Sequence, residues 1–66
     1  MTIDEKFIEQ TKAKIVQWDH ERIELEARVA QGNEAPDQLQ ICKQRIIELK
    51  SQADAAKKQI DELQNA

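Results

Sequence analysis

The chain has 66 residues, of which 39% are apolar and 35% are charged, and its formal net charge is −3. A chain of this length forms at most one small domain with a thin core. Charges of both signs are interspersed, which excludes a basic tail or an acidic run. No apolar stretch approaches the roughly 18 residues of a membrane span. The first ten residues lack an apolar segment flanked by positive charge, so no signal peptide is expected.

The first predicted element is a helix over residues 3–31. Thr2 and Glu5 have the spacing of a capping box, in which the hydroxyl accepts from the third amide of the helix. The only glycine of the chain, Gly32, can take the left-handed conformation that ends a helix. Because no other Gly and no Pro precedes Gly32, nothing interrupts this helix before Gly32.

The sequence predicts a single helical hairpin over residues 1–66, in which a turn over residues 32–35 follows the first helix and a second helix spans residues 36–64. The only proline, Pro36, suits the first turn of a helix, where its missing N–H is no loss. A short loop between two long helices makes them antiparallel neighbours. The sequence therefore predicts an all-α fold, an antiparallel two-helix coiled-coil hairpin.

Each predicted helix carries one row of apolar residues at alternating steps of three and four, the heptad pattern of a coiled coil. On the second helix the row is unbroken and consists of Leu39, Cys42, Ile46, Leu49, Ala53, Ala56, Ile60 and Leu63. On the first helix it is less regular and consists of Ile8, Thr11, Ile15, Trp18, Arg22, Leu25 and Val29.

Side-chain size predicts how the two rows are aligned. If Val29 lies level with Cys42, then Trp18 faces Ala53, so that a large side chain meets a small one. Ile15 and Ala56 form a second such pair. The same alignment places two acidic residues of the first helix near two lysines of the second, and the expected ion pairs are Glu26 with Lys43 and Asp19 with Lys50.

The segment QWDHER, residues 17–22, resembles a reactive cluster, but a helix separates its side chains. Successive residues point about 100° apart, so Trp18 faces the second helix and His20 faces away from it. His20 and Glu24 share a face, yet two ligands do not complete a zinc or iron site. Cys42 is expected to be a buried small hydrophobe that His20 cannot reach. We therefore predict no catalytic residue, no metal site and no cofactor, and the sequence leaves open a redox role of Cys42.

Several residues outside the paired rows predict an interface. Val16, Ile23 and Ile47 are apolar and lie off the rows, with Ala27 and Ala30 nearby. A grouped apolar patch marks an interaction surface, and small domains without disulfides gain stability by association. The hairpin is therefore expected to form a homodimer, a four-helix bundle, through this patch. Binding of another protein's helix is the alternative use of the patch.

Arg22 occupies a position in the row of the first helix where an aliphatic residue is usual. The aliphatic part of its side chain either covers the row while the guanidinium stays in water, or the guanidinium reaches an acidic residue of a second hairpin. The second possibility adds Arg22 to the predicted interface.

The segment FIEQTKAKIVQWDHERIELEARV resembles the opening of small bacterial coiled-coil proteins of unassigned function, and IIELKSQADAAKKQIDELQ is similar to their second helix. The matching positions are Phe7, Ile8, Lys12, Ala13, Ile15, Trp18, Asp19, Leu25, Glu26, Ala27 and Arg28. This resemblance implies a helical-hairpin fold and carries no catalytic residue. The chain departs from the pattern at Val16, Ile23 and Ile47, where charged residues are expected, and at Arg22, where an aliphatic is expected.

The leading functional hypothesis is a non-enzymatic interaction or oligomerisation module, with no small-molecule substrate and no membrane partner, in the cytoplasm. A lone cysteine, which cannot form an internal disulfide, fits that reducing compartment. The alternative is a small RNA- or DNA-binding helical-hairpin dimer. It depends on a row of lysines that phosphates could contact, namely Lys43, Lys50, Lys57 and Lys58.

Overall fold

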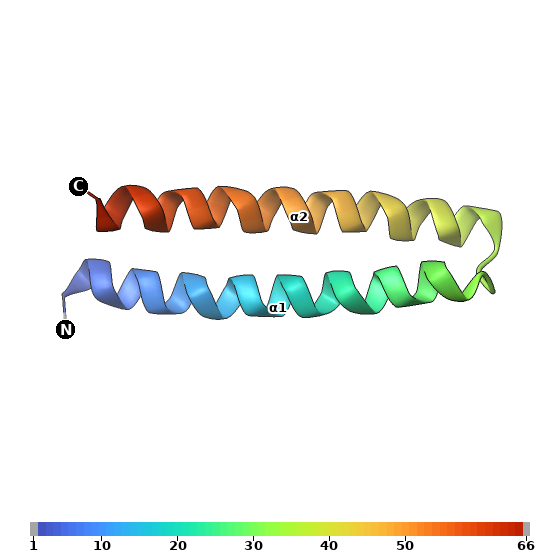
Figure 1. Cartoon of the computed structure of the whole chain (residues 1–66), viewed down its shortest axis with the longest axis horizontal. Coiled ribbons are helices and arrows are strands. Elements are labelled where there is room, and N and C mark those ends of the chain that lie inside the picture. Colours follow the sequence, from blue (N-terminus) through green and yellow to red (C-terminus); the bar gives the residue numbers. More distant parts are fainter. Residues whose placement is uncertain (1, 66) are drawn as a thin grey trace.

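The computed structural model describes residues 2–65, which form two helices, α1 (Ile3–Gln31) and α2 (Pro36–Gln64), joined by a short turn. The helices lie side by side and run in opposite directions, so that both termini lie at one end of a rod (Figure 1). The rod measures 47 × 16 × 14 Å. The predicted all-α, antiparallel helical hairpin is therefore confirmed.

Local capping explains where α1 begins. Thr2 has extended backbone, and its hydroxyl accepts a hydrogen bond of 3.1 Å from the amide of Glu5. Asp4 and Glu5 place negative charge in the first turn, where it interacts favourably with the positive end of the helix dipole. The sequence prediction of a Thr2 cap is thus confirmed by the geometry of its hydroxyl.

The turn depends on Gly32, which has φ 71° and ψ 16° and is the only residue with positive φ among those described. Its amide donates a hydrogen bond of 3.2 Å to the carbonyl of Val29 and so satisfies one of the free carbonyls at the end of α1. Pro36 occupies the start of α2, as expected from its fixed φ. The turn is also tied to α1 by Arg28, whose Nε lies 2.9 Å from Oε1 of Glu34. The hydrogen bond to Glu34, followed by the charge of Glu34, raises the pKa of Arg28.

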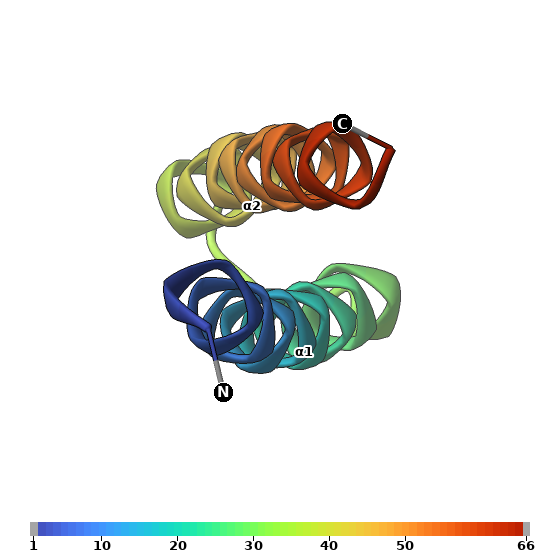
Figure 2. The ribbon, with the colours of Figure 1, turned by 90° about the vertical axis from the view of Figure 1, so that its left-hand side faces the viewer.

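The core is a single layer of side chains between the two helices. A cluster of buried residues in this layer consists of Ile15, Ala53, Ala56 and Ile60, with Ile8 and Trp18 packed against it. Leu49 and Cys42 are also buried, at 1% and 4% exposure. Viewed along the rod, the two helices cross each other at a shallow inclination (Figure 2), and alanines on α2 allow them to approach beside the large Trp18 and Ile15 of α1.

One residue of the predicted rows departs from the expected burial. Leu63 lies near the free end of α2 and is exposed. The partly buried Ile8 and the exposed Phe7 and Ile3 flank the same end. The apolar side chains at this end of the two heptad rows are exposed because both helices end here, so no further helical turn packs over them.

The Gly32 conformation yields a first prediction. Gly32→Ala should lower the free energy of unfolding by about 1 kcal/mol, because a Cβ is disfavoured at positive φ. A Cβ at this position would meet no heavy atom within 4 Å, so the cost should be conformational only. Thermal unfolding followed by circular dichroism at one fixed protein concentration should show a Tm lower by about 4–8 °C.

Gly32→Asn is the matched control, because Asn adopts the left-handed conformation more readily than Ala and should lose less stability. Equal stability of the Ala variant and the parent chain would show that the turn does not depend on this backbone geometry.

Candidate interaction surface

The residues of the QWDHER segment point in different directions, as expected. Trp18 is half-buried against the core cluster, whereas His20 lies on the outside of α1 with its Nε2 3.0 Å from Oε1 of Glu24. Both members of this pair are well exposed, and an exposed pair of this kind contributes little to stability. Within residues 2–65, no group of three or more His, Cys, Asp or Glu side chains is placed to hold a metal ion.

Arg22 makes its ion pairs within α1. Its Nη1 donates to Oε1 of Glu26 at 2.8 Å, and its Nη2 lies 3.9 Å from Oδ1 of Asp19. The side chain of Arg22 is 24% exposed, which is consistent with an apolar stem covering the core and a head reaching water. Arg22 therefore satisfies its charge without a second hairpin.

The predicted ion pairs of Glu26 with Lys43 and of Asp19 with Lys50 are wrong. Neither pair lies within 4.0 Å among the described residues, and both carboxylates face Arg22 instead. The guanidinium of Arg22 is three residues from Asp19 and four from Glu26 on the same helix, and its several N–H donors can reach both carboxylates. Two flexible side chains on different helices would have to be ordered to form the expected pairs.

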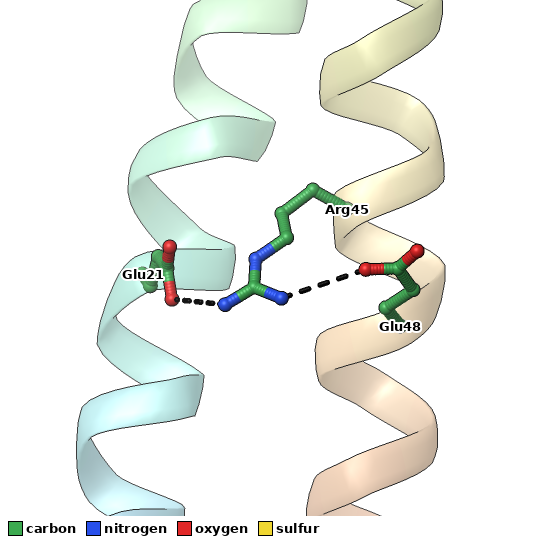
Figure 3. Close-up of polar contacts among 3 residues, drawn as sticks. All are labelled: Glu21, Arg45 and Glu48. Carbon is green, nitrogen blue, oxygen red and sulfur yellow. Dashed lines mark hydrogen bonds and ion pairs between the residues drawn. The ribbon is translucent and has the colours of Figure 1, made fainter.

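The ion pair that does join the helices lies on the opposite side of the core. Arg45 of α2 extends toward α1, where its Nη2 lies 3.3 Å from Oε2 of Glu21, and its Nη1 lies 3.5 Å from Oε2 of Glu48 on its own helix (Figure 3). The hydrogen bond with Glu21, followed by the charge of Glu21, raises the pKa of Arg45. Glu21, Arg45 and Glu48 define what we call the clasped flank of the hairpin.

The other side, which we call the open flank, has no ion pair between the helices in the part of the chain that the structure describes. It is marked by a shallow apolar hollow between the helices that is lined by Lys12, Ile15, Val16, Lys57 and Ile60. Lys12 and Lys57 have the same charge, so they cannot close this flank as Glu21 and Arg45 close the other. The hairpin therefore has two chemically different sides.

The apolar residues predicted to form an interface are exposed. Val16, Ile23 and Ile47 have 67%, 56% and 61% of their surface in water, and Ala27 and Ala30 are exposed as well. Four of these five residues lie on α1, and only Ile47 lies on α2. Ile41 is exposed to a similar extent, at 60%, and was not among the predicted residues. Its position outside the heptad row of α2 was the available signal.

The four lysines of the alternative hypothesis are also exposed. In the described part of the chain none of them lies within 4.0 Å of a carboxylate in an ion pair. Acidic residues of α2 alternate with them, however, because Asp54 follows Lys50 by four residues and Asp61 follows Lys57 by four. Such spacing puts a carboxylate on the same helix face as each of these amino groups, which weakens the attraction of the row for phosphate.

The chain matches no family model, no curated protein and no solved structure. The structure itself is that of a small two-helix protein. Neither described helix combines the length and the apolar content that crossing a membrane requires.

The place of Arg22 yields a second prediction. Arg22→Leu should raise the free energy of unfolding by about 1 kcal/mol, because an aliphatic side chain at this half-buried position covers the core without a charge to hydrate. Urea unfolding followed by circular dichroism measures the change. Arg22→Gln is the control for loss of charge alone. A Leu variant less stable than the parent chain would show that the ion pairs of Arg22 outweigh apolar packing at this position.

Proposed function

We propose that this chain is a non-enzymatic protein-interaction module whose partner is a second copy of itself. The observation that carries the proposal is the exposure of Val16, Ile23 and Ile47, three large apolar side chains outside the packed core. Val16 and Ile23 lie seven residues apart on one face of α1, and apolar side chains grouped in water are typical of interaction surfaces. The thin core adds to this argument, since among residues 2–65 Leu49 is the only large side chain less than 2% exposed, and domains of this size are commonly stabilised by association.

The proposal extends to the setting of the protein. The resemblance of its sequence to small bacterial coiled-coil proteins supports a bacterial, cytoplasmic protein of this structural class. The buried, unpaired Cys42 fits a reducing compartment. The ion-paired side chains of the described residues are spread along the outside of a rod, as expected of a module that acts by binding rather than by catalysis.

The molecular mass in solution tests the proposal. Sedimentation equilibrium at micromolar concentration should give about twice the mass of one chain. The double variant Ile23→Glu, Ile47→Glu should give the mass of one chain with its helical circular dichroism retained, because both positions are exposed and their charges do not enter the core. The measured quantity is the mass of each variant at equal concentration.

The matched control is Gln10→Glu, Gln44→Glu, which introduces the same charge at exposed polar positions of both helices. It should keep the doubled mass. A folded parent chain that sediments as a monomer at micromolar concentration would contradict self-association, and binding of the patch to a different helical protein would then be the remaining form of the proposal.

The lysines of α2 give the alternative function, RNA or DNA binding, its own test. A gel-shift assay at low salt should show no complex with duplex or hairpin RNA or with duplex DNA, because the net charge is −3 and aspartates share the lysine face. A complex that is weakened by Lys43→Gln, Lys50→Gln and by rising salt would instead favour nucleic-acid binding.

A further inference from the structure

Helix α1 carries a second row of residues on its outer side. Starting at Ala13, these residues follow each other at alternating steps of three and four, and all of them are exposed. At about 100° per residue, this row lies about 150° around the helix axis from the row that packs against α2. We call it the outer row, and it consists of Ala13, Val16, His20, Ile23, Ala27 and Ala30.

The corresponding positions of α2 do not form such a row. They are occupied by Gln40, Gln44, Ile47, Ser51, Asp54 and Lys58. Five of these six residues are polar or charged, whereas five of the six on α1 are apolar. A helix with apolar rows on opposite sides has two surfaces to bury, and one with a single row has one. Within the hairpin, α1 is thus the helix whose outer surface is unpartnered.

We infer that the outer row packs against the outer row of a second copy, with the two α1 helices antiparallel. This inference rests on the self-association proposed above and specifies its geometry. The dimer axis passes between His20 and Ile23, so His20 faces Ile23 of the second copy. Val16 then faces Ala27 of the second copy, and Ala13 faces Ala30 of the second copy.

Side-chain size fits this alignment. Each Val16 meets a small Ala27, so the two helices can approach closely without a void or a clash. The same match between a large and a small residue aligns α1 with α2 inside the hairpin, where Trp18 and Ile15 pack beside Ala53 and Ala56.

The direction of packing follows from charge. In a parallel, in-register pair the two copies of Lys12 would lie on opposite sides of the interface, and each Asp19 would approach Glu24 of the second copy, which is repulsive. In the antiparallel pair Lys12 approaches Glu26 of the second copy on both sides of the axis, which is attractive. Asp19 meets its own copy at the axis, and the guanidinium of Arg22 lies 3.9 Å from it to offset that repulsion.

The exposed surface supports a second copy as the occupant. A compact folded monomer of this mass, 7.6 kDa, exposes about 4,300 Å², whereas the hairpin exposes 5148 Å². The excess is close to the roughly 800 Å² that each partner contributes to an interface of standard size. The hairpin therefore has enough surplus surface for a stable dimer. Because the outer row lies nearly opposite α2, the four helices form an open layer, with the two α1 helices inside, rather than a closed bundle.

Cysteine cross-linking tests the alignment, in a chain that also carries Cys42→Ala to remove the native thiol. Under mild oxidation, a mixture of the Val16→Cys and Ala27→Cys chains should form a disulfide-linked dimer at least about tenfold faster than either chain alone. The proposed dimer holds these two thiols together at a high effective concentration. It separates the two Val16 positions by eleven residues along the helices, about 16 Å.

Ile47→Cys is the control for random collision, since Ile47 is as exposed as the residues of the outer row but lies on α2. It should cross-link slowly. Cross-linking of Val16→Cys alone as fast as the mixture would overturn the antiparallel arrangement, and so would a mixture no faster than Ile47→Cys.

The single variants Ile23→Glu and Ile47→Glu separate this inference from the proposed function. Ile23→Glu alone should abolish the doubled mass, and Ile47→Glu alone should leave it intact, although both residues are isoleucines of similar exposure. Dissociation by Ile47→Glu to the same extent as by Ile23→Glu would place the interface on a surface that includes α2 and refute the outer-row dimer while retaining self-association. A monomeric parent chain would refute both.

Discussion

The packing of α1 against α2 through one layer of side chains is the constraint on which the remaining features depend. The helices approach because α2 supplies alanines, Ala53 and Ala56, beside the large Trp18 and Ile15 of α1. A layer this thin leaves most of each helix in contact with water. The ion pairs and the unpartnered apolar residues therefore lie on the surface of an elongated molecule.

The two helices contribute differently to that surface. The outside of α2 is polar or charged at most positions, and apart from Ile41 and Ile47 it resembles the solvated face of an ordinary amphipathic helix. The outside of α1 carries Val16 and Ile23 in the outer row. Arg22 lies in the row of α1 that packs against α2, where its stem covers the core and its guanidinium forms ion pairs with Asp19 and Glu26. This arrangement keeps two carboxylates engaged beside the proposed dimer interface.

The fold could be predicted from the sequence because it depends on a few residues whose effect on the backbone or on burial is determined by their near neighbours in the chain. One glycine ends α1 with a conformation that other residues avoid, and the unbroken heptad row of α2 determines which face is buried. The ion pairs could not be predicted in the same way. Heptad positions allow Asp19 and Glu26 to reach either Lys50 and Lys43 or Arg22, and the choice depends on side-chain length, donor geometry and entropy. The clasp between Glu21 and Arg45 was equally allowed by sequence and was overlooked. The exposure of Leu63 could not be predicted either, because it depends on how far the opposite helix extends over the end of the heptad row.

The position of the turn gives the hairpin a preferred order of assembly. Residues that pair beside Gly32 are separated by only a few positions in the chain, whereas Ile3 and Gln64, at the free end, are about sixty positions apart. Closing the short loop costs less entropy than closing the long one, so pairing starts beside the turn and propagates toward the termini like a zipper. The exposed Leu63 and Ile3 mark the last segment to join and the first to fray. Most of the outer row lies in the half of α1 nearer the turn, on the part of the rod that persists when the free end opens.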